Sequence, residues 1–118
     1  MKDTNILISN SVDLDGAIST LGDIETYNEI LNDFLDEINE KLSNLNQYKT
    51  SNDSSNYAII AHSIKSDAKY LGFIKLAEKA LEHELAGKDN NLSFIEKDYT
   101  NFLNEINQYI NISHEYLD

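Results

Sequence analysis

Apolar residues recur every three or four positions through most of this chain, and no proline interrupts them. The longest such stretch carries Ile24, Tyr27, Ile30, Leu31, Phe34, Leu35, Ile38, Leu42 and Leu45. This period is typical of an amphipathic helix that buries one face. Gly22 and Asp23 supply a break and an N-cap before it, and a polar run at residues 50–55 follows it. The sequence therefore predicts one long helix that begins at residue 24 and ends at this polar loop.

Three more helices are expected after the loop. One runs from about residue 54 to Leu71 and stops at Gly72, because glycine can adopt the left-handed conformation that closes a helix. The next covers residues 74–86, and Gly87 is expected to end it in the same way. Its inward face is expected to carry Leu76, Ala77, Ala80, Leu81 and Leu85. The last covers about 93–113, and short links between four such helices predict an all-α, antiparallel up-and-down four-helix bundle.

The N-terminal part of the chain is expected to be an addition to this bundle. Apolar residues at 12–21 indicate a short helix that caps one end of the bundle. Residues 1–10 are expected to be a flexible arm. A length of 118 residues suits one domain with a real core, so residues 11–118 are expected to form a single unit.

The composition limits the classes of partner. The chain has 9 Lys and Arg against 21 Asp and Glu, a formal net charge of -12, which opposes nucleic acid and anionic lipid surfaces. The absence of cysteine excludes disulfides and thiolate metal sites. No apolar run approaches the roughly 20 residues that a membrane span needs, and the N-terminus lacks the pattern of a signal peptide. We therefore expect a cytoplasmic protein without nucleic-acid binding or membrane insertion.

The stretch AHSIKSDAKYLGF, residues 61–73, holds a histidine among small and cationic residues. On a helical wheel of about 100° per residue, one side of this helix carries Ala58, His62, Lys65, Ser66 and Lys69. The opposite side carries Ile60, Ile64 and Leu71, which should face the core. The lysines give a local positive field that suits an anion brought to the imidazole. Spacing alone, however, favours an ordinary solvated histidine.

The same stretch resembles the signature of histidine-containing phosphotransfer (HPt) domains, Ala-His-x-hydrophobic-Lys-(Gly/Ser)-x-Ala-x-x-Leu-Gly. The similarity extends upstream through LGDIETYNEILNDFLDEI and downstream through LAEKALEHEL, so it covers residues 12 to about 110. The resemblance implies a phosphorelay carrier without turnover of its own or a cofactor. In such a relay His62 accepts a phosphoryl group from a response-regulator receiver aspartate, or from a sensor histidine kinase, and passes it to another receiver. The receiver supplies its own carboxylates and Mg²⁺.

Roles for neighbouring residues follow from this resemblance. Lys65 is implied to lie beside the phosphoryl group, and Ser66 is a small residue that lets the partner approach. Glu84 corresponds to the polar residue on the following helix that holds the other imidazole nitrogen and orients the ring. Lys88 matches a position where some relatives carry a basic residue near the phosphate.

Two further residues of the motif are assigned on other grounds. Lys69 occupies a variable position in the family pattern, so its place near the phosphate rests on the helical wheel alone. Asp67 replaces a residue that is usually small and neutral, and its charge either faces the partner or opposes the phosphate.

Two other kinds of function differ from this one in what they require of the sequence. A carboxylate-bridged metal centre is disfavoured, because the chain has no Glu-x-x-His and His83 points about 100° away from Glu84. His114 is expected to be exposed near the terminus. The phosphotransfer domain is expected to be a monomer. The alternative from another class is a helical module that docks a receiver or another signalling protein without phosphorylation. An exposed apolar patch that includes Ile59 and Phe73 would serve as the docking surface in either case.

Overall fold

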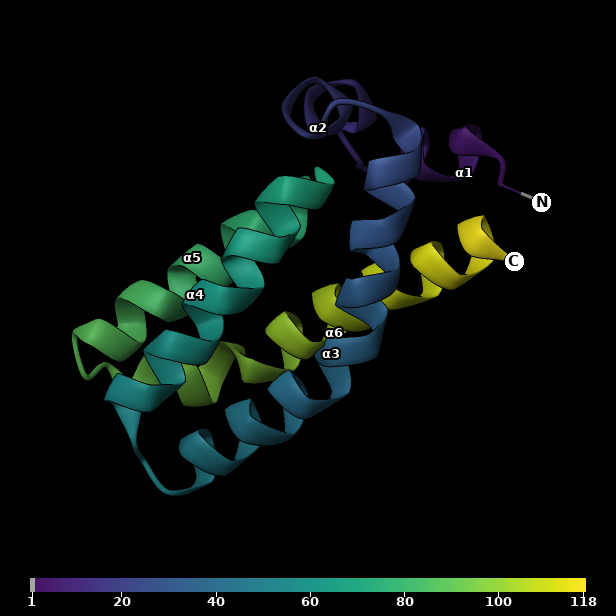
Figure 1. Cartoon of the computed structure of the whole chain (residues 1–118). Coiled ribbons are helices and arrows are strands. Elements are labelled where there is room, and N and C mark those ends of the chain that lie inside the picture. The colour runs from purple at the N-terminus through teal and green to yellow at the C-terminus, as the bar shows by residue number, and fades with distance from the viewer. Residues whose placement is uncertain (1) are drawn as a thin grey trace.

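The computed structural model describes residues 2–118 and is helical through most of them, which confirms the all-α prediction. The helices of this part of the chain are α1 (Thr4–Ile8), α2 (Leu14–Leu21), α3 (Ile24–Thr50), α4 (Ser54–Leu71), α5 (Ile74–Lys88) and α6 (Leu92–Leu117). Helices α3 to α6 run alternately up and down an elongated molecule, with α4 and α5 side by side and α2 at one end (Figure 1). The predicted bundle with a short capping helix is therefore the observed architecture.

Local signals define both ends of α4, the helix that carries the motif. At its start the Asp53 side chain accepts a hydrogen bond from the Asn56 backbone N–H at 3.3 Å, which satisfies one free donor of the first turn. At its end Gly72 adopts a left-handed conformation with φ 73°. A Cβ at Gly72 would also meet the backbone of Asp13. Glycine is thus required there by conformation and by the close approach of the N-terminal segment.

Aromatic packing closes the bundle core just after this turn. Phe73 is fully buried, stacks on Tyr109 with ring centroids 4.5 Å apart, and meets Phe34 edge-on at 5.5 Å. The sequence predicts Phe73 in an exposed patch, and this prediction is wrong. The turn at Gly72 directs the next side chain into the bundle, where a ring of this size is covered on all sides.

The N-terminal segment also differs from expectation. Residues expected to be a flexible arm include α1, whose Leu7 is fully buried, and α1 packs against α6. Tyr109 on α6 donates a hydrogen bond to the Ser11 carbonyl at 3.0 Å. Residues 4–11 are therefore docked on the bundle, because one large apolar side chain and one backbone acceptor find partners on a helix almost 100 residues further along the chain.

Gly87 lies inside α5 rather than after it, since the helix continues to Lys88. A Cβ added to Gly87 would lie 2.8 Å from the Ala58 Cβ and 2.8 Å from the Ser54 carbonyl oxygen of α4. The expectation that Gly87 ends the helix was therefore wrong. Its missing side chain instead lets α4 and α5 approach closely.

The inward face of α5 is rotated relative to the one expected. Leu76 and Ala80 are fully buried as predicted, but Leu81 and Leu85 are 40% and 50% exposed. His83 takes the inward position in their place and is fully buried. A helical wheel that assigns only apolar residues to the buried side does not predict this face, because His83 lies in the middle of it.

Candidate functional site

His62 stands on the open side of α4, because the opposite side of the helix is the core-facing one. Ala61, Ile64 and Ala68 are fully buried, whereas the His62 side chain is 58% exposed. Ala58 was expected on the same open side, but it is buried at the crossing with α5 beside Gly87. The imidazole therefore projects from a rigid helix that is packed directly on its neighbour.

Glu84 on α5 is the centre of the polar contacts around this ring. His62 Nδ1 lies 3.0 Å from Glu84 Oε2, and Lys88 Nζ lies 2.9 Å from the same oxygen. Lys65 Nζ lies 2.6 Å from Oε1, which is an ion pair without good hydrogen-bond geometry. An ionised carboxylate only accepts hydrogen bonds, so His62 Nδ1 carries the proton. In the neutral ring the lone pair is then on Nε2.

Two ammonium groups and the His62 ring keep Glu84 ionised although its side chain is only 3% exposed. Burial by itself would raise the pKa of this carboxyl, but the contacts with Lys65, Lys88 and His62 outweigh it and lower the pKa to about 2. The carboxylate is thus charged throughout the physiological range. Two ammonium groups beside one carboxylate leave an excess positive charge next to the imidazole.

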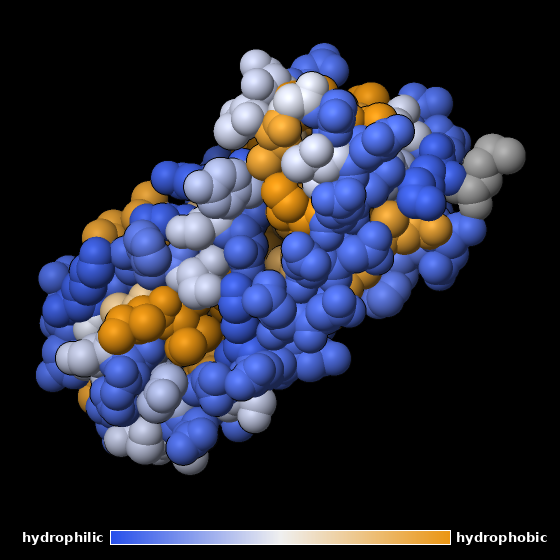
Figure 2. Space-filling model, in the orientation of Figure 1, coloured by the Kyte–Doolittle hydropathy of each residue, from blue (hydrophilic) through white to orange (hydrophobic). Residues whose placement is uncertain are grey.

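A shallow groove of about 380 Å³ opens directly on this cluster. Its lining residues come from the first half of α4 and the second half of α5: Ser55, Ala58, Ile59, His62, Glu84 and Lys88. Ile59 is 63% exposed, so the groove has an apolar rim one turn before the histidine. Figure 2 shows an apolar patch over the first half of α4 within a mostly hydrophilic surface. A partner could therefore contact apolar and cationic groups together.

Ser66 and Lys69 lie on the other side of the histidine along α4. They line a second groove of about 330 Å³ with Thr20 of α2 and Tyr70. Ser66 is half-buried, whereas Lys69 is exposed. The structure therefore brings Lys65 and Lys88 to the Glu84 cluster and places Lys69 further along the same face.

Asp67 turns away from this face. Its Oδ2 lies 2.6 Å from Lys41 Nζ of α3, with both side chains mostly buried. The Asp67 charge is therefore paired within the bundle and is not directed at an anion on His62. The sequence could not assign this role because the two residues are 26 positions apart.

The other two histidines do not contact the Glu84 carboxylate. His114 is exposed on α6, as expected. His83 is fully buried and is hydrogen-bonded to Tyr57 of α4 and Asp98 of α6. Sequence reasoning did not find these contacts, because each joins residues at least 15 positions apart and no local spacing signals them.

A known protein family matches the part of the chain that holds the Glu84 cluster. The model of the Hpt domain matches residues 29–111, which include α4, α5 and the whole Glu84 cluster. Neither the curated proteins nor the solved structures give a match. Within residues 2–118 no helix has the length and apolar character needed to cross a membrane. Hpt domains are helical carriers that pass phosphoryl groups through a histidine and interact with response-regulator receivers in two-component signalling. The match covers well over half of the chain and includes the exposed His62, so this protein belongs to the Hpt domain family.

Proposed function

We propose that His62 is the phosphoacceptor of this Hpt domain, and that it relays a phosphoryl group between receiver aspartates or from a sensor histidine kinase to a receiver. The observation that carries the proposal is the contact between His62 Nδ1 and the buried Glu84 carboxylate. This contact leaves Nε2 as the nucleophilic nitrogen of a solvent-exposed ring. A relay also requires access to a second protein, and the 58% exposure of the imidazole supports that access.

The transfer step follows from this arrangement. The Nε2 lone pair attacks the phosphorus of an aspartyl phosphate, and a new N–P bond forms as the P–O bond to the aspartate breaks. The bonding electrons leave with the aspartate carboxylate, and the phosphorylated ring becomes positively charged. Glu84 stabilises that charge through the Nδ1–H. Transfer to the next receiver is the same step in reverse.

Lys65 and Lys88 are proposed to stabilise the phosphoryl oxygens. Both ammonium groups lie within 3 Å of the carboxylate that holds the ring, so a short movement of either side chain brings it toward a phosphoryl group on Nε2. Hydrogen bonds between an ammonium group and a phosphate are strong because both partners are charged. Lys69, further along α4, is proposed to contribute only to the longer-range field.

We propose that the partner binds the face of the molecule on which His62 and the two grooves lie. Ser66 leaves room for a receiver to approach, and Ile59 supplies an apolar contact that is 63% exposed. We propose a monomeric carrier in the cytoplasm. The second candidate is a docking module that binds the same partner without phosphorylation, and the exposed Ile59 would serve it equally well.

Phosphoramidate tests the acceptor without any protein partner, because it transfers a phosphoryl group directly to an accessible histidine and releases ammonia. The wild-type protein should gain one acid-labile, base-stable phosphate, and His62→Gln should gain none. His114→Gln is the matched control, since it removes another exposed histidine and should label normally. A labelled His62→Gln protein would place the acceptor elsewhere. A wild-type protein that takes label neither from phosphoramidate nor from phosphorylated receivers would favour the docking module.

A further inference from the structure

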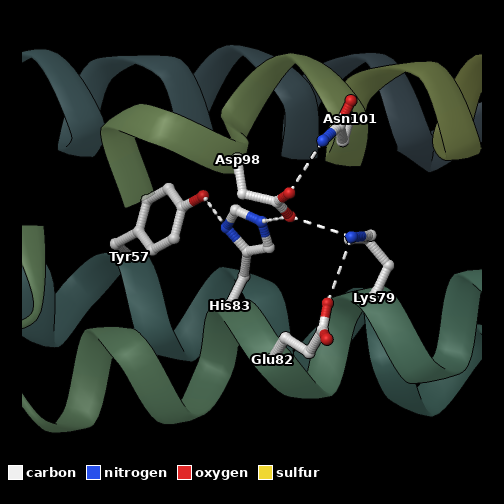
Figure 3. Close-up of polar contacts among 6 residues, drawn as sticks. All are labelled: Tyr57, Lys79, Glu82, His83, Asp98 and Asn101. Atoms are coloured by element: carbon white, nitrogen blue, oxygen red, sulfur yellow. Dashed lines mark hydrogen bonds and ion pairs between the residues drawn. The ribbon is translucent and has the colours of Figure 1, made fainter. Parts of the chain in front are cut away.

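A second histidine lies in the core directly behind the site. His83 is fully buried and stacks on Phe102, with ring centroids 4.4 Å apart. Its Nδ1 lies 2.7 Å from the Tyr57 hydroxyl of α4, and its Nε2 lies 2.9 Å from Asp98 Oδ2 of α6. Figure 3 shows the imidazole between these two partners. One side chain of α5 thus joins three helices of the bundle.

The protons in this network have one arrangement. Burial would raise the pKa of Asp98, but its contacts with Asn101, His83 and Lys79 outweigh burial and lower the pKa to about 2. The ionised Asp98 can only accept, so His83 Nε2 donates to it. Burial dominates at His83 and lowers its pKa despite the nearby Asp98, so the ring stays neutral. Its Nδ1 therefore accepts from the Tyr57 hydroxyl.

The hydrogen bonds of His83 to α4 and α6 also affect the direction of the Glu84 side chain. Glu84 follows His83 directly in α5, and Tyr57 lies in α4 five residues before His62. A rotation of α5 by about 20° would move a side-chain tip about 6 Å from the helix axis by about 2 Å. A shift of that size would break the 3.0 Å contact between Glu84 and His62. The two hydrogen bonds of His83 oppose such a rotation, because they hold α5 on both sides.

We propose that His83 is a positioning residue for the phosphotransfer site, which keeps α5 in the rotation that places the Glu84 carboxylate against His62 Nδ1. This inference rests on the proposed role of His62 and extends it to a residue that never touches the phosphoryl group. Gly87 assists by allowing α4 and α5 to pack closely one turn further along. Close packing alone does not fix the rotation of α5 about its axis, whereas a directional hydrogen bond does.

Tyr57→Phe is the sharpest test, because it removes one hydroxyl and keeps the ring. The measured quantity is the ratio of Nδ1–H to Nε2–H forms of the neutral His62 ring, obtained from the nitrogen chemical shifts of the imidazole by NMR. We expect this ratio to fall about fivefold, the factor that corresponds to one weakened hydrogen bond. Labelling by phosphoramidate should slow about tenfold, because the ring is no longer held in its reactive orientation.

Tyr116→Phe is the matched control. The Tyr116 hydroxyl lies 2.7 Å from Asn28 Oδ1, the same distance as in the Tyr57 contact, but it joins α6 to α3 and does not involve α5. Both variants lose one hydroxyl contact and should unfold more easily, whereas only Tyr57→Phe should change the His62 ring. His83→Phe, which keeps the aromatic stacking and removes both hydrogen bonds, should reproduce the effect of Tyr57→Phe.

The outcomes separate this inference from the proposed function. If Tyr57→Phe and Tyr116→Phe lower stability alike and leave the His62 tautomer ratio unchanged, His83 has a structural role alone and the inference is wrong. If the wild-type protein takes up no phosphate but its His62 tautomer ratio still responds to Tyr57→Phe, the positioning role stands and the proposed phosphotransfer fails.

Discussion

Replacing Glu84 by glutamine removes one charge and keeps the shape of the side chain, so it isolates the electrostatic role of this carboxylate. Of the three side chains that contact it, Lys65 is the most buried, at 14% exposed against 58% for His62 and 60% for Lys88. An exposed ion pair contributes about 0.2–1 kcal/mol, whereas a contact to a charged group shielded from water contributes about 1.5–3 kcal/mol. Lys65 therefore dominates, and we expect the free energy of unfolding to fall by about 2–3 kcal/mol at neutral pH.

The effect of this change should depend on pH in a defined direction. The folded-state pKa of Glu84 is lowered from 4.5 to about 2, so its ionised form stabilises the folded protein. That stabilisation is complete above the unfolded-state pKa and is lost as the pH falls toward the folded-state value. The difference between wild-type protein and Glu84→Gln should therefore shrink as the pH falls from about 4.5 to about 2. Urea unfolding followed by circular dichroism at several pH values measures it.

Glu82→Gln is the matched control for this experiment. Glu82 lies on the same helix, is 54% exposed, and pairs with Lys79 at 3.1 Å. Because this pair is more exposed to water, we expect a loss of less than about 1 kcal/mol. Equal losses for the two variants, or a loss for Glu84→Gln that does not change with pH, would refute the argument that shielded ion pairs with Glu84 stabilise the site.

Two other substitutions test the docking face and the helix crossing. Ser66→Phe should slow phosphoryl transfer from a phosphorylated receiver at least several-fold. Labelling by phosphoramidate should not change, because the bulky ring obstructs only a protein-sized donor. If Ser66→Phe and the wild-type protein accept the phosphoryl group from the receiver at equal rates, the partner approaches from another side. Gly87→Ala should lower the free energy of unfolding by about 1–3 kcal/mol in urea titrations, because the added methyl group meets Ala58 and Ser54 at 2.8 Å. Alanine is the better helix former by about 1 kcal/mol, so a more stable variant would show that the two helices separate easily.

The sequence predicts the helical elements well where their signals are local. The period of apolar residues marks the long helix α3, and Gly72 marks the end of α4. The same local information places His62 on an outward face, because a helical wheel depends only on the spacing within one helix. The family signature adds the expectation that Glu84 on the next helix faces the ring, and the two side chains do lie 3.0 Å apart.

Features that depend on two helices at once follow from the tertiary structure alone. The sequence predicts that Gly87 ends a helix. Its role at the α4–α5 crossing follows only from the tertiary structure, which places Ala58 opposite it. The sequence leaves open whether the Asp67 charge faces a partner or opposes a phosphate, and only the structure shows that Asp67 pairs with Lys41 of α3. Leu7, in a segment expected to be a flexible arm, is buried because α6 returns to it from the far end of the chain.

His83 shows the physical reason most clearly. Local spacing determines which residues share a face of a helix, but it does not determine the rotation at which that face meets its neighbours. The rotation of α5 is decided by packing and by hydrogen bonds to α4 and α6, in which a buried histidine replaces the leucines expected to face inward. The sequence by itself thus determined the four long helices, the family and the outward position of His62. The tertiary structure decided which carboxylate, lysines and buried network surround that histidine, because those contacts form between segments that are distant in the chain.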